Sequence, residues 1–266
     1  MTGLLRSFRG GAVLALAALV GGAFATPPIN SAVVNSRVFN DDGDSNFTSS
    51  DLYPALVRLS DLNVDGDGQG GEFANRHNFR LSTNDIVGEN FANNDAFAFF
   101  STVTMTGAVE GGLQVSPWWS QNVDGQFMIN GISGEVAVFG GRLPFYSFTG
   151  NWGVTYTPGE VVRMGVVYDP RDLNSVNPAR IRYYYSEGGN HYGSPWINFD
   201  EGNPAEDPPH GLWGMLNDAQ VGGYMQVPIM TPGNNGVIEF RDSTFVPEPS
   251  SLLLIGLAGV GLLRRR

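Results

Sequence analysis

The 266-residue sequence lacks two residue types altogether, cysteine and lysine. Without cysteine the chain can form no disulfide, thiolate nucleophile, cysteine-ligated zinc site or thioether link to haem. Without lysine it can form neither a Schiff base nor the lysine–phosphate contact of P-loop and kinase sites. These absences exclude whole reaction classes before any motif is considered.

Positive charge is also scarce, since 15 arginines stand against 26 acidic residues, for a formal net charge of −11. Five of the arginines lie at the two ends, at Arg6, Arg9 and 264–266. Leaving these and Glu248 aside, 10 arginines face 25 acidic residues, about −15 for the body of the chain. Such a body repels phosphate backbones, so we expect no nucleic-acid binding. Divalent cations and neutral glycans are compatible with it.

The N-terminus, MTGLLRSFRGGAVLALAALVGGAFATPP, has the three parts of a secretory signal peptide. Its two arginines precede an apolar run over 12–20, and Ala23 and Ala25 form a small-x-small cleavage site. We expect a signal helix within residues 1–25, removed by signal peptidase. An uncleaved membrane anchor is the alternative, but the apolar run is short for one.

The C-terminus, VPEPSSLLLIGLAGVGLLRRR, joins a proline-framed glutamate to a short apolar run and three arginines. As a helix, residues 252–263 would reach only about 18 Å, against about 30 Å of hydrocarbon core, so the run alone is a poor permanent anchor. The arginines would stay on the cytoplasmic side, and the prolines would hold the segment before the run extended. The motif residues are Val246, Pro247, Glu248, Pro249, Arg264, Arg265 and Arg266.

These three parts, in this order, resemble the PEP-CTERM sorting signal of secreted proteins from Gram-negative, exopolysaccharide-producing bacteria. The resemblance covers residues 246–266. It implies transient insertion in the inner membrane, cleavage by exosortase, an integral-membrane cysteine peptidase, and release or transfer to the cell surface. A buried strand followed by a basic tail is the alternative, but the three glycines of the run suit a membrane helix better.

Between the ends, from residue 26 to 245, apolar and polar residues alternate and helical periodicity is almost absent. In DAFAFFSTVTMTG, Phe97, Phe99, Val103 and Met105 share one parity while threonines take the other. With 36 glycines available for tight turns, we expect one all-β domain, a two-layer antiparallel β-sandwich of jelly-roll type. Further strands are expected at 32–39, 78–81, 126–129, 135–139 and 237–240.

Two other segments show regular patterns. FYSFTGNWGVTYT predicts a strand, because its large apolar residues share one parity, namely Tyr146, Phe148, Trp152, Val154 and Tyr156. SSDLYPALVRL opens with a Ser/Asp cap, which is compatible with a short helix carrying Leu52, Leu56 and Leu59.

The segment VVRMGVVYDPRDLNSVNPARIRYYYSEGG predicts two strands joined by a loop, with Asp-Pro and Asn-Pro at the turns. An alternating strand that ends in Tyr168-Asp169 and is followed by an aromatic strand resembles the hairpin of laminin-G and concanavalin-like sandwiches. This resemblance implies the fold only, because one hairpin cannot carry a function across.

DLNVDGDGQGGE matches the spacing of an EF-hand calcium loop, in which hard oxygen ligands converge around a glycine turn. Calcium is therefore the candidate cofactor. A plain acidic surface turn is the alternative, because position 8 is Gly68 instead of an apolar residue and the chain after the loop predicts a strand. The candidate ligands are Asp61, Asn63, Asp65, Asp67 and Glu72.

Local catalytic signatures are missing from the sequence. It contains neither His-Glu-x-x-His nor Gly-x-Ser-x-Gly, and the paired-carboxylate strand of retaining β-sandwich glycosidases is absent. His77, which lies in a strand pattern, is expected to play a structural part. We expect no catalysis, with a polysaccharide hydrolase or lyase built from dispersed residues as the alternative.

Aromatic residues suggest a second class of function, because Trp and Tyr rings present flat apolar faces with a polar edge to sugars. Core packing is the alternative for most of them. The candidate glycan-binding residues are Trp118, Trp119, Tyr192, Trp196 and Trp213. The first interpretation is thus a non-catalytic, exosortase-processed surface or matrix protein, and the second is a calcium-assisted carbohydrate-binding module with exopolysaccharide as partner.

Overall fold

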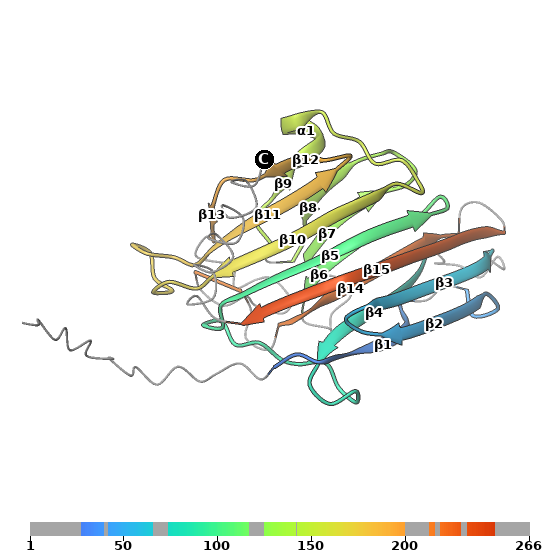
Figure 1. Ribbon diagram of the computed structural model, residues 1–266, viewed down its shortest axis with the longest axis horizontal. Coiled ribbons are helices and arrows are strands. Elements are labelled where there is room, and N and C mark those ends of the chain that lie inside the picture. The colour runs from blue at the N-terminus through green and yellow to red at the C-terminus, as the bar shows by residue number, and fades with distance from the viewer. Residues whose placement is uncertain are drawn as a thin grey trace, which may run out of the picture.

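The computed structural model describes residues 28–39, 42–65, 74–116, 125–141, 143–199, 213–215, 219–229 and 233–247. Within these residues two antiparallel sheets lie face to face (Figure 1). The predicted all-β, two-layer sandwich is therefore confirmed. The predicted signal helix and C-terminal membrane helix lie outside the described residues, and no helix inside them is long and apolar enough to cross a membrane.

Sheet A has the strand order β1-β4-β14-β6-β7-β8-β9, and every neighbouring pair is antiparallel. Its strands are β1 (Ser31–Phe39), β4 (Ala74–Ser82), β14 (Gln220–Pro228), β6 (Glu110–Ser116), β7 (Gly125–Asn130), β8 (Val136–Phe139) and β9 (Tyr146–Ser147).

Sheet B has the strand order β12-β11-β10-β5-β15-β3-β2, and β13 pairs with β11 beside this path. Its strands are β12 (Asn190–Gly193), β11 (Arg180–Glu187), β10 (Val161–Asp169), β5 (Phe97–Thr106), β15 (Asn234–Pro247), β3 (Leu56–Val64), β2 (Asn46–Leu52) and β13 (Ile197–Asn198).

The hydrophobic core lies between the sheets, as the alternation predicted. Phe97, Phe99, Val103 and Met105 of β5 are all buried there. Phe79 of sheet A meets Phe240 of sheet B edge to face, with ring centroids 4.9 Å apart. Burial of each large apolar side chain contributes about 1.5–3 kcal/mol, so these paired faces drive the two sheets together.

Residues 148–152 form a single helical turn, α1 (Phe148–Trp152), where alternation predicted a strand. That prediction was wrong because local capping outweighs the apolar pattern. The Ser147 hydroxyl accepts a hydrogen bond from the Gly150 N–H at 2.8 Å, and Gly153 ends the turn with φ 69°. Trp152 is consequently 54% exposed, outside the core.

The segment around residue 54 forms the β2–β3 hairpin where a short helix was compatible with the sequence. Leu52 pairs with Leu56, and the Ala55 N–H donates to the Leu52 carbonyl at 2.9 Å. The helix prediction was wrong because cross-strand pairing satisfies the backbone along both segments, while Pro54 supplies no N–H for a helix.

The last strand, β15, extends beyond residue 245, where the domain was expected to end. Val246 pairs with Ala98 and Pro247 pairs with Phe97 of β5. The sheet thus includes the first two residues assigned to the sorting signal.

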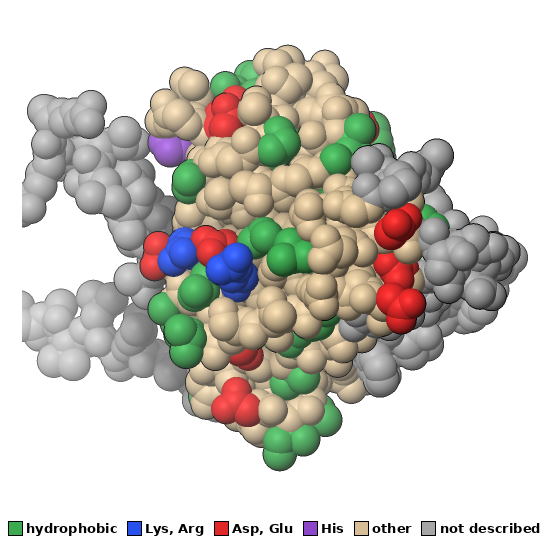
Figure 2. All heavy atoms as spheres, turned by 90° about the vertical axis from the view of Figure 1, so that its right-hand side faces the viewer, with side chains coloured by type: hydrophobic (Ala, Val, Ile, Leu, Met, Phe, Trp, Pro, Cys, Tyr) green, Lys and Arg blue, Asp and Glu red, His purple; other side chains and the backbone are tan. Residues whose placement is uncertain are grey.

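Charged side chains are spread over the surface among neutral atoms. Figure 2 shows one face, on which the visible basic side chains lie beside acidic ones. Arg58 and Arg241 of sheet B both contact Glu239, at 3.9 and 2.8 Å, and Arg180 contacts Asp169 at 2.9 Å. Several arginines of this acidic chain are therefore neutralised by a carboxylate.

Candidate functional site

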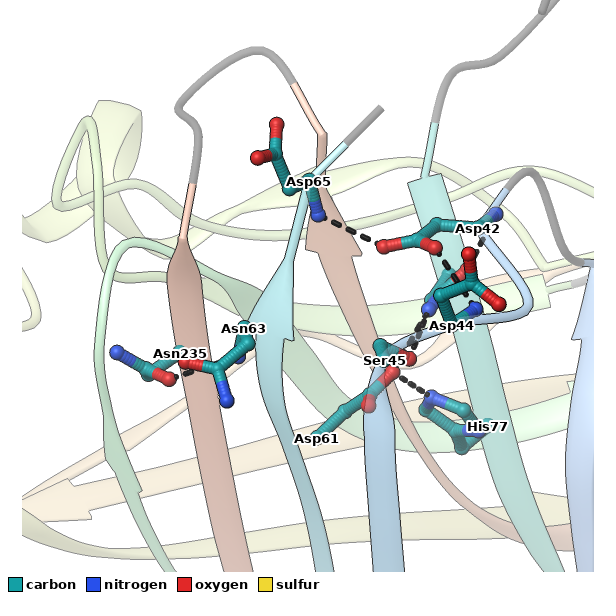
Figure 3. A network of polar contacts seen from close by, with 9 residues as sticks. Asp42, Asp44, Ser45, Asp61, Asn63, Asp65, His77 and Asn235 are labelled. Carbon is teal, nitrogen blue, oxygen red and sulfur yellow. Dashed lines mark hydrogen bonds and ion pairs between the residues drawn. The ribbon is translucent and has the colours of Figure 1, made fainter. Parts of the chain in front are cut away.

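Asp61, the first residue of the predicted calcium loop, lies on β3 with its side chain fully buried (Figure 3). Its Oδ2 lies 2.7 Å from His77 Nε2 and accepts a hydrogen bond from Asn75 Nδ2 at 2.8 Å. Both partners belong to β4, so the carboxylate links sheet B to sheet A. Phe47 stacks on the other side of His77, with ring centroids 4.0 Å apart.

The surroundings of Asp61 keep it ionised. Burial by itself would raise the pKa of Asp61, but hydrogen bonds from His77, Ser45 and Asn75, together with the charge of His77, outweigh burial and lower that pKa. Oδ1 of Asp61 has no hydrogen-bond partner in the described structure. Asp61 and His77 therefore form a buried polar link between the sheets, and the expected structural part of His77 agrees with this geometry.

Asp42 holds the neighbouring segments together through backbone amides. Its Oδ1 accepts from the Asp44 N–H at 2.9 Å, and its Oδ2 accepts from the Asp65 N–H at 2.7 Å (Figure 3). Its own N–H donates to Asn75 Oδ1 at 3.1 Å. The Asp42 carboxylate thus fixes the end of β3 against the segment that leads into β2.

The described candidates for calcium point in different directions. Asp61 turns inward, whereas Asn63 and Asp65 are exposed, and the Asn63 N–H donates to Asn235 Oδ1 at 2.9 Å (Figure 3). Within the described residues no group of three His, Cys, Asp or Glu side chains is placed to hold a metal ion. Asp67 and Glu72 lie outside the described residues, so calcium binding stays a prediction.

The predicted glycan-binding aromatics have separate surroundings. Tyr192 of β12 packs against Trp152, with ring centroids 5.8 Å apart, and Trp196 lies under the Arg180 guanidinium at 4.4 Å. Trp213 is half-buried, and its carbonyl accepts from the Ala179 N–H at 2.8 Å. Trp118 and Trp119 lie outside the described residues. A shared platform of these five stays a prediction.

Sequence reasoning missed a set of polar residues on the outer face of sheet A, the face opposite the core. Because Phe79 and Leu81 of β4 face the core, the alternate residues of that strand face outward. The pairing registers align the outward residues of four neighbouring strands into rows, and two of these rows are mostly polar. The first row is Arg80, Gly222, Gln114 and Gln126, and the second is Arg76, Gln226, Glu110 and Asn130.

The first row is buried. Arg80 Nη1 donates to Gln114 Oε1 at 2.7 Å, and each of these residues is 1% exposed. Gln114 Nε2 has no hydrogen-bond partner in the described structure. A buried amide nitrogen without an acceptor costs about 1–3 kcal/mol.

The second row is more accessible except at Arg76, which is buried. Glu110 and Gln226 are half-buried cross-strand neighbours, and Arg76 lies over the Tyr224 ring at 4.6 Å. Burial raises the pKa of Glu110, and the charge of Arg76 partly offsets this rise. Amide, carboxylate and guanidinium groups in one row can both accept from and donate to hydroxyl groups.

The strand patterns held a signal for this face. NRHNFR places Arg76, Asn78 and Arg80 on one parity of a strand whose other parity packs on the core. The neighbouring strands GGLQVS and GGYMQV are rich in glycine, and their glycines weaken a strand prediction from sequence.

The family model of the PEP-CTERM protein-sorting motif matches residues 245–266. The C-terminal segment is therefore this sorting motif, which implies export, exosortase processing and sorting to the cell surface. The match covers that segment alone and leaves the activity of the sandwich open. A search of curated proteins finds no match to the sequence.

Three solved structures similar to this chain are an alginate lyase and two lectin-like proteins. The alginate lyase from Corynebacterium sp. has a TM-score of 0.44 and 10% identity, covering 83% of this chain and 95% of its own. Arcelin-5, a lectin-like defence protein from Phaseolus vulgaris, has a TM-score of 0.39 and 12% identity, covering 82% and 99%. Lectin UEA-II, complexed with galactose, has a TM-score of 0.41 and 7% identity, covering 82% and 98%. At these values the similarity assigns no activity to this chain.

Proposed function

We propose that this is an exported, exosortase-processed, non-catalytic protein of the cell surface or extracellular matrix, and that it binds exopolysaccharide through the outer face of sheet A. The sorting motif supports the location. The observation that carries the binding function is the pair of neighbouring side chains Glu110 and Gln226.

Glu110 and Gln226 occupy directly opposed positions on β6 and β14. Both are half-buried, and neither side chain makes a hydrogen bond to another described residue. Polar groups that are partly removed from water without a partner are costly, so such a pair favours a ligand that replaces the lost water. Sugar hydroxyls do so, because each can donate to the carboxylate and accept from the amide.

The charges of this row favour a neutral sugar ring. Arg76 is the register neighbour of Gln226, and it balances the charge of Glu110. The acidic body of the chain also disfavours long polyanions at a row whose one cation is balanced in this way. A hydroxyl-rich, uncharged stretch of polysaccharide is therefore the best match.

The distribution of carboxylates supports a binding function without catalysis. Glu110 carries the single carboxylate among the strands of sheet A that the structure describes. Glycoside hydrolysis generally needs a pair of carboxyl groups flanking the scissile bond. One carboxylate beside an amide suits recognition of hydroxyls better than bond cleavage.

The test is retention of the purified full chain on the host's exopolysaccharide. The double variant Glu110→Gln with Gln226→Ala replaces a charged acceptor by a neutral amide and removes the second amide, at about 1 kcal/mol each, so we expect affinity to fall about tenfold or more. Glu135→Gln, an exposed change beside β8 of the same sheet, is the matched control and should bind normally. Unaltered retention of the double variant would overturn the site, and shortening of the polysaccharide by the wild type would overturn the non-catalytic assignment.

A further inference from the structure

On the other side of the sandwich, the outer face of sheet B contains a pocket of about 530 Å³, which we name the arginine pocket. It lies over β5, β10, β11 and β12, four neighbouring strands of the sheet. It is lined by Phe100, Arg163, Arg182, Tyr184, Ser186, His191, Tyr192 and Gly193. The lining contains two arginines and a histidine but no acidic residue.

The floor of the arginine pocket is built around Gly165 of β10. Gly165 pairs with both Phe100 and Tyr184, whose rings lie on the outer face with centroids 5.7 Å apart. A Cβ atom on Gly165 would lie 2.1 Å from the Phe100 ring, so the ring closes over the glycine. Shielding of a glycine by aromatic rings explains the two rings, but it does not explain the two arginines.

The two guanidinium groups lie above these rings. Arg163 Cζ is 6.0 Å from the Phe100 centroid, and Arg182 Cζ is 5.0 Å from the Tyr184 centroid. Contacts of this kind hold the planar groups in place and contribute about 0.5–1 kcal/mol each at exposed sites. The arginines are therefore oriented before any ligand arrives.

Both arginines keep unused donors. Arg163 Nη1 donates to Thr102 Oγ1 at 3.0 Å and to the Asp242 carbonyl at 3.1 Å, and Arg182 Nε donates to the Ser194 carbonyl at 2.9 Å. All of these acceptors are neutral oxygens. Burial lowers the pKa of Arg163, and the charge of Asp242 partly offsets this effect.

The arginine pocket differs in this respect from other parts of the surface. Arg180 and Arg241 each contact a carboxylate, at 2.9 and 2.8 Å. In the part of the chain that the structure describes, no carboxylate lies within salt-bridge distance of Arg163 or Arg182. Two half-buried cations with no carboxylate at salt-bridge distance, in an acidic protein, indicate an anionic ligand.

We infer that the arginine pocket binds the carboxylate of an acidic sugar residue. The planar forks of Arg163 and Arg182 receive the carboxylate, and the aromatic floor packs against the sugar ring. Ser186 and His191, whose Oγ and Nδ1 lie 2.9 Å apart, face hydroxyls at the rim. This site lies on the sheet opposite the proposed glycan face and does not depend on it, so one domain could bridge two polysaccharide segments.

The experiment is calorimetric titration of the full chain with an oligogalacturonate and with the methyl ester of the same oligosaccharide. We expect binding of the acid form and at least about tenfold weaker binding of the ester, because a charge-assisted fork is lost. Arg182→Ala should weaken binding of the acid form about tenfold or more, and Arg182→Lys should give a smaller loss because it keeps charge without the fork. Arg58→Ala removes an equal charge elsewhere on sheet B and should change little.

Each alternative outcome overturns the inference. Equal binding of acid and ester would mean that the carboxylate is not recognised, and dextran sulfate binding as tightly would indicate a general anion site. Wild-type affinity in Arg182→Ala, with an unchanged melting temperature, would exclude the pocket. The double variant Glu110→Gln with Gln226→Ala should keep full affinity for the acid form, and its loss there would move the binding to sheet A. Failure of the proposed glycan face alone leaves these results unaffected.

Discussion

Two charged regions of this molecule differ in how their polar groups are satisfied. At the end of the sandwich, Asp61 and His77 are fully buried and lie 2.7 Å apart. In the arginine pocket, Arg163 and Arg182 are half-buried and meet only neutral oxygens among the described residues. The first arrangement stabilises the fold because the carboxylate and the imidazole are hydrogen-bonded to each other. The second leaves donors directed at solvent, which is what a binding surface needs.

The largest expected effect is a loss of stability, and it concerns the buried pair and not the arginine pocket. Asp61→Ala removes the carboxylate of a buried polar pair, so we expect the free energy of unfolding to fall by about 3–5 kcal/mol in urea titration. Asp44→Ala, an exposed change nearby, should alter it by about 0.5 kcal/mol or less. A loss under about 1 kcal/mol for Asp61→Ala would remove the assigned structural role. Binding of the oligogalacturonate should be unaffected at temperatures where the variant is folded.

The second expected effect is a loss of stability at low pH. Because the pKa of Asp61 is lower in the folded state than its ordinary value of 3.8, its stabilisation is present above that value and is lost as pH falls through the folded pKa. The wild type should therefore lose stability below about pH 4 more steeply than Asp61→Asn. Chemical unfolding at a series of pH values measures this difference, and parallel curves would contradict it.

A smaller effect is expected for the proposed glycan face. Burial raises the pKa of Glu110 above its ordinary value of 4.5, so the carboxylate becomes protonated at a higher pH than an exposed glutamate. Retention on neutral glycan should weaken several-fold as pH falls through that pKa, because the strong acceptor is lost. Glu110→Gln should bind more weakly but without this pH dependence. A pH-dependent Glu110→Gln variant would assign the effect to another group.

The smallest expected effect tests whether the position of the Arg182 guanidinium in the arginine pocket matters for binding. A Cβ atom on Gly193 would lie 3.2 Å from Arg182 Nη2, so Gly193→Ala should displace the guanidinium by a few tenths of an ångström. We expect affinity for the oligogalacturonate to fall a few-fold with an unchanged melting temperature, since the position is at the surface. Gly43→Ala, at an exposed glycine with nothing within 4 Å of its Cβ and no left-handed backbone, tests the general cost of an added methyl group.

Alternation predicted the core correctly because a buried face imposes a strict two-residue period on a strand. It failed at Phe148–Trp152, where Ser147 and Gly153 cap a helical turn whose apolar residues happen to share one parity. Capping depends on backbone geometry that parity alone does not reveal.

The arginine pocket was within reach of the same reasoning. Phe100 and Tyr184 are large aromatics on the polar parity of their strands, and each breaks an otherwise regular pattern. What the sequence cannot supply is the register that places both rings beside Gly165. That register is set by long-range pairing of β5 and β11 with β10.

The same limit applies to the predicted calcium loop. Its spacing is complete in the sequence, but Asp61 also lies on a strand, where it shares the inward parity of Val57 and Leu59 and meets His77 of the neighbouring sheet. The spacing of a local motif therefore does not show that one of its carboxylates pairs with a residue on another strand.

The pairing of Pro247 with Phe97 has a consequence for maturation. An interior strand of the folded body and the start of the matched export tag, Phe245 to Pro247, are one continuous strand. Cleavage just after that strand would leave a product whose last residue is paired in the sheet. Such a product has no C-terminal segment beyond the sheet for other peptidases to cleave. A cut inside the strand would require the enzyme to peel β15 away from β5 first, so folding itself would protect these residues from cleavage.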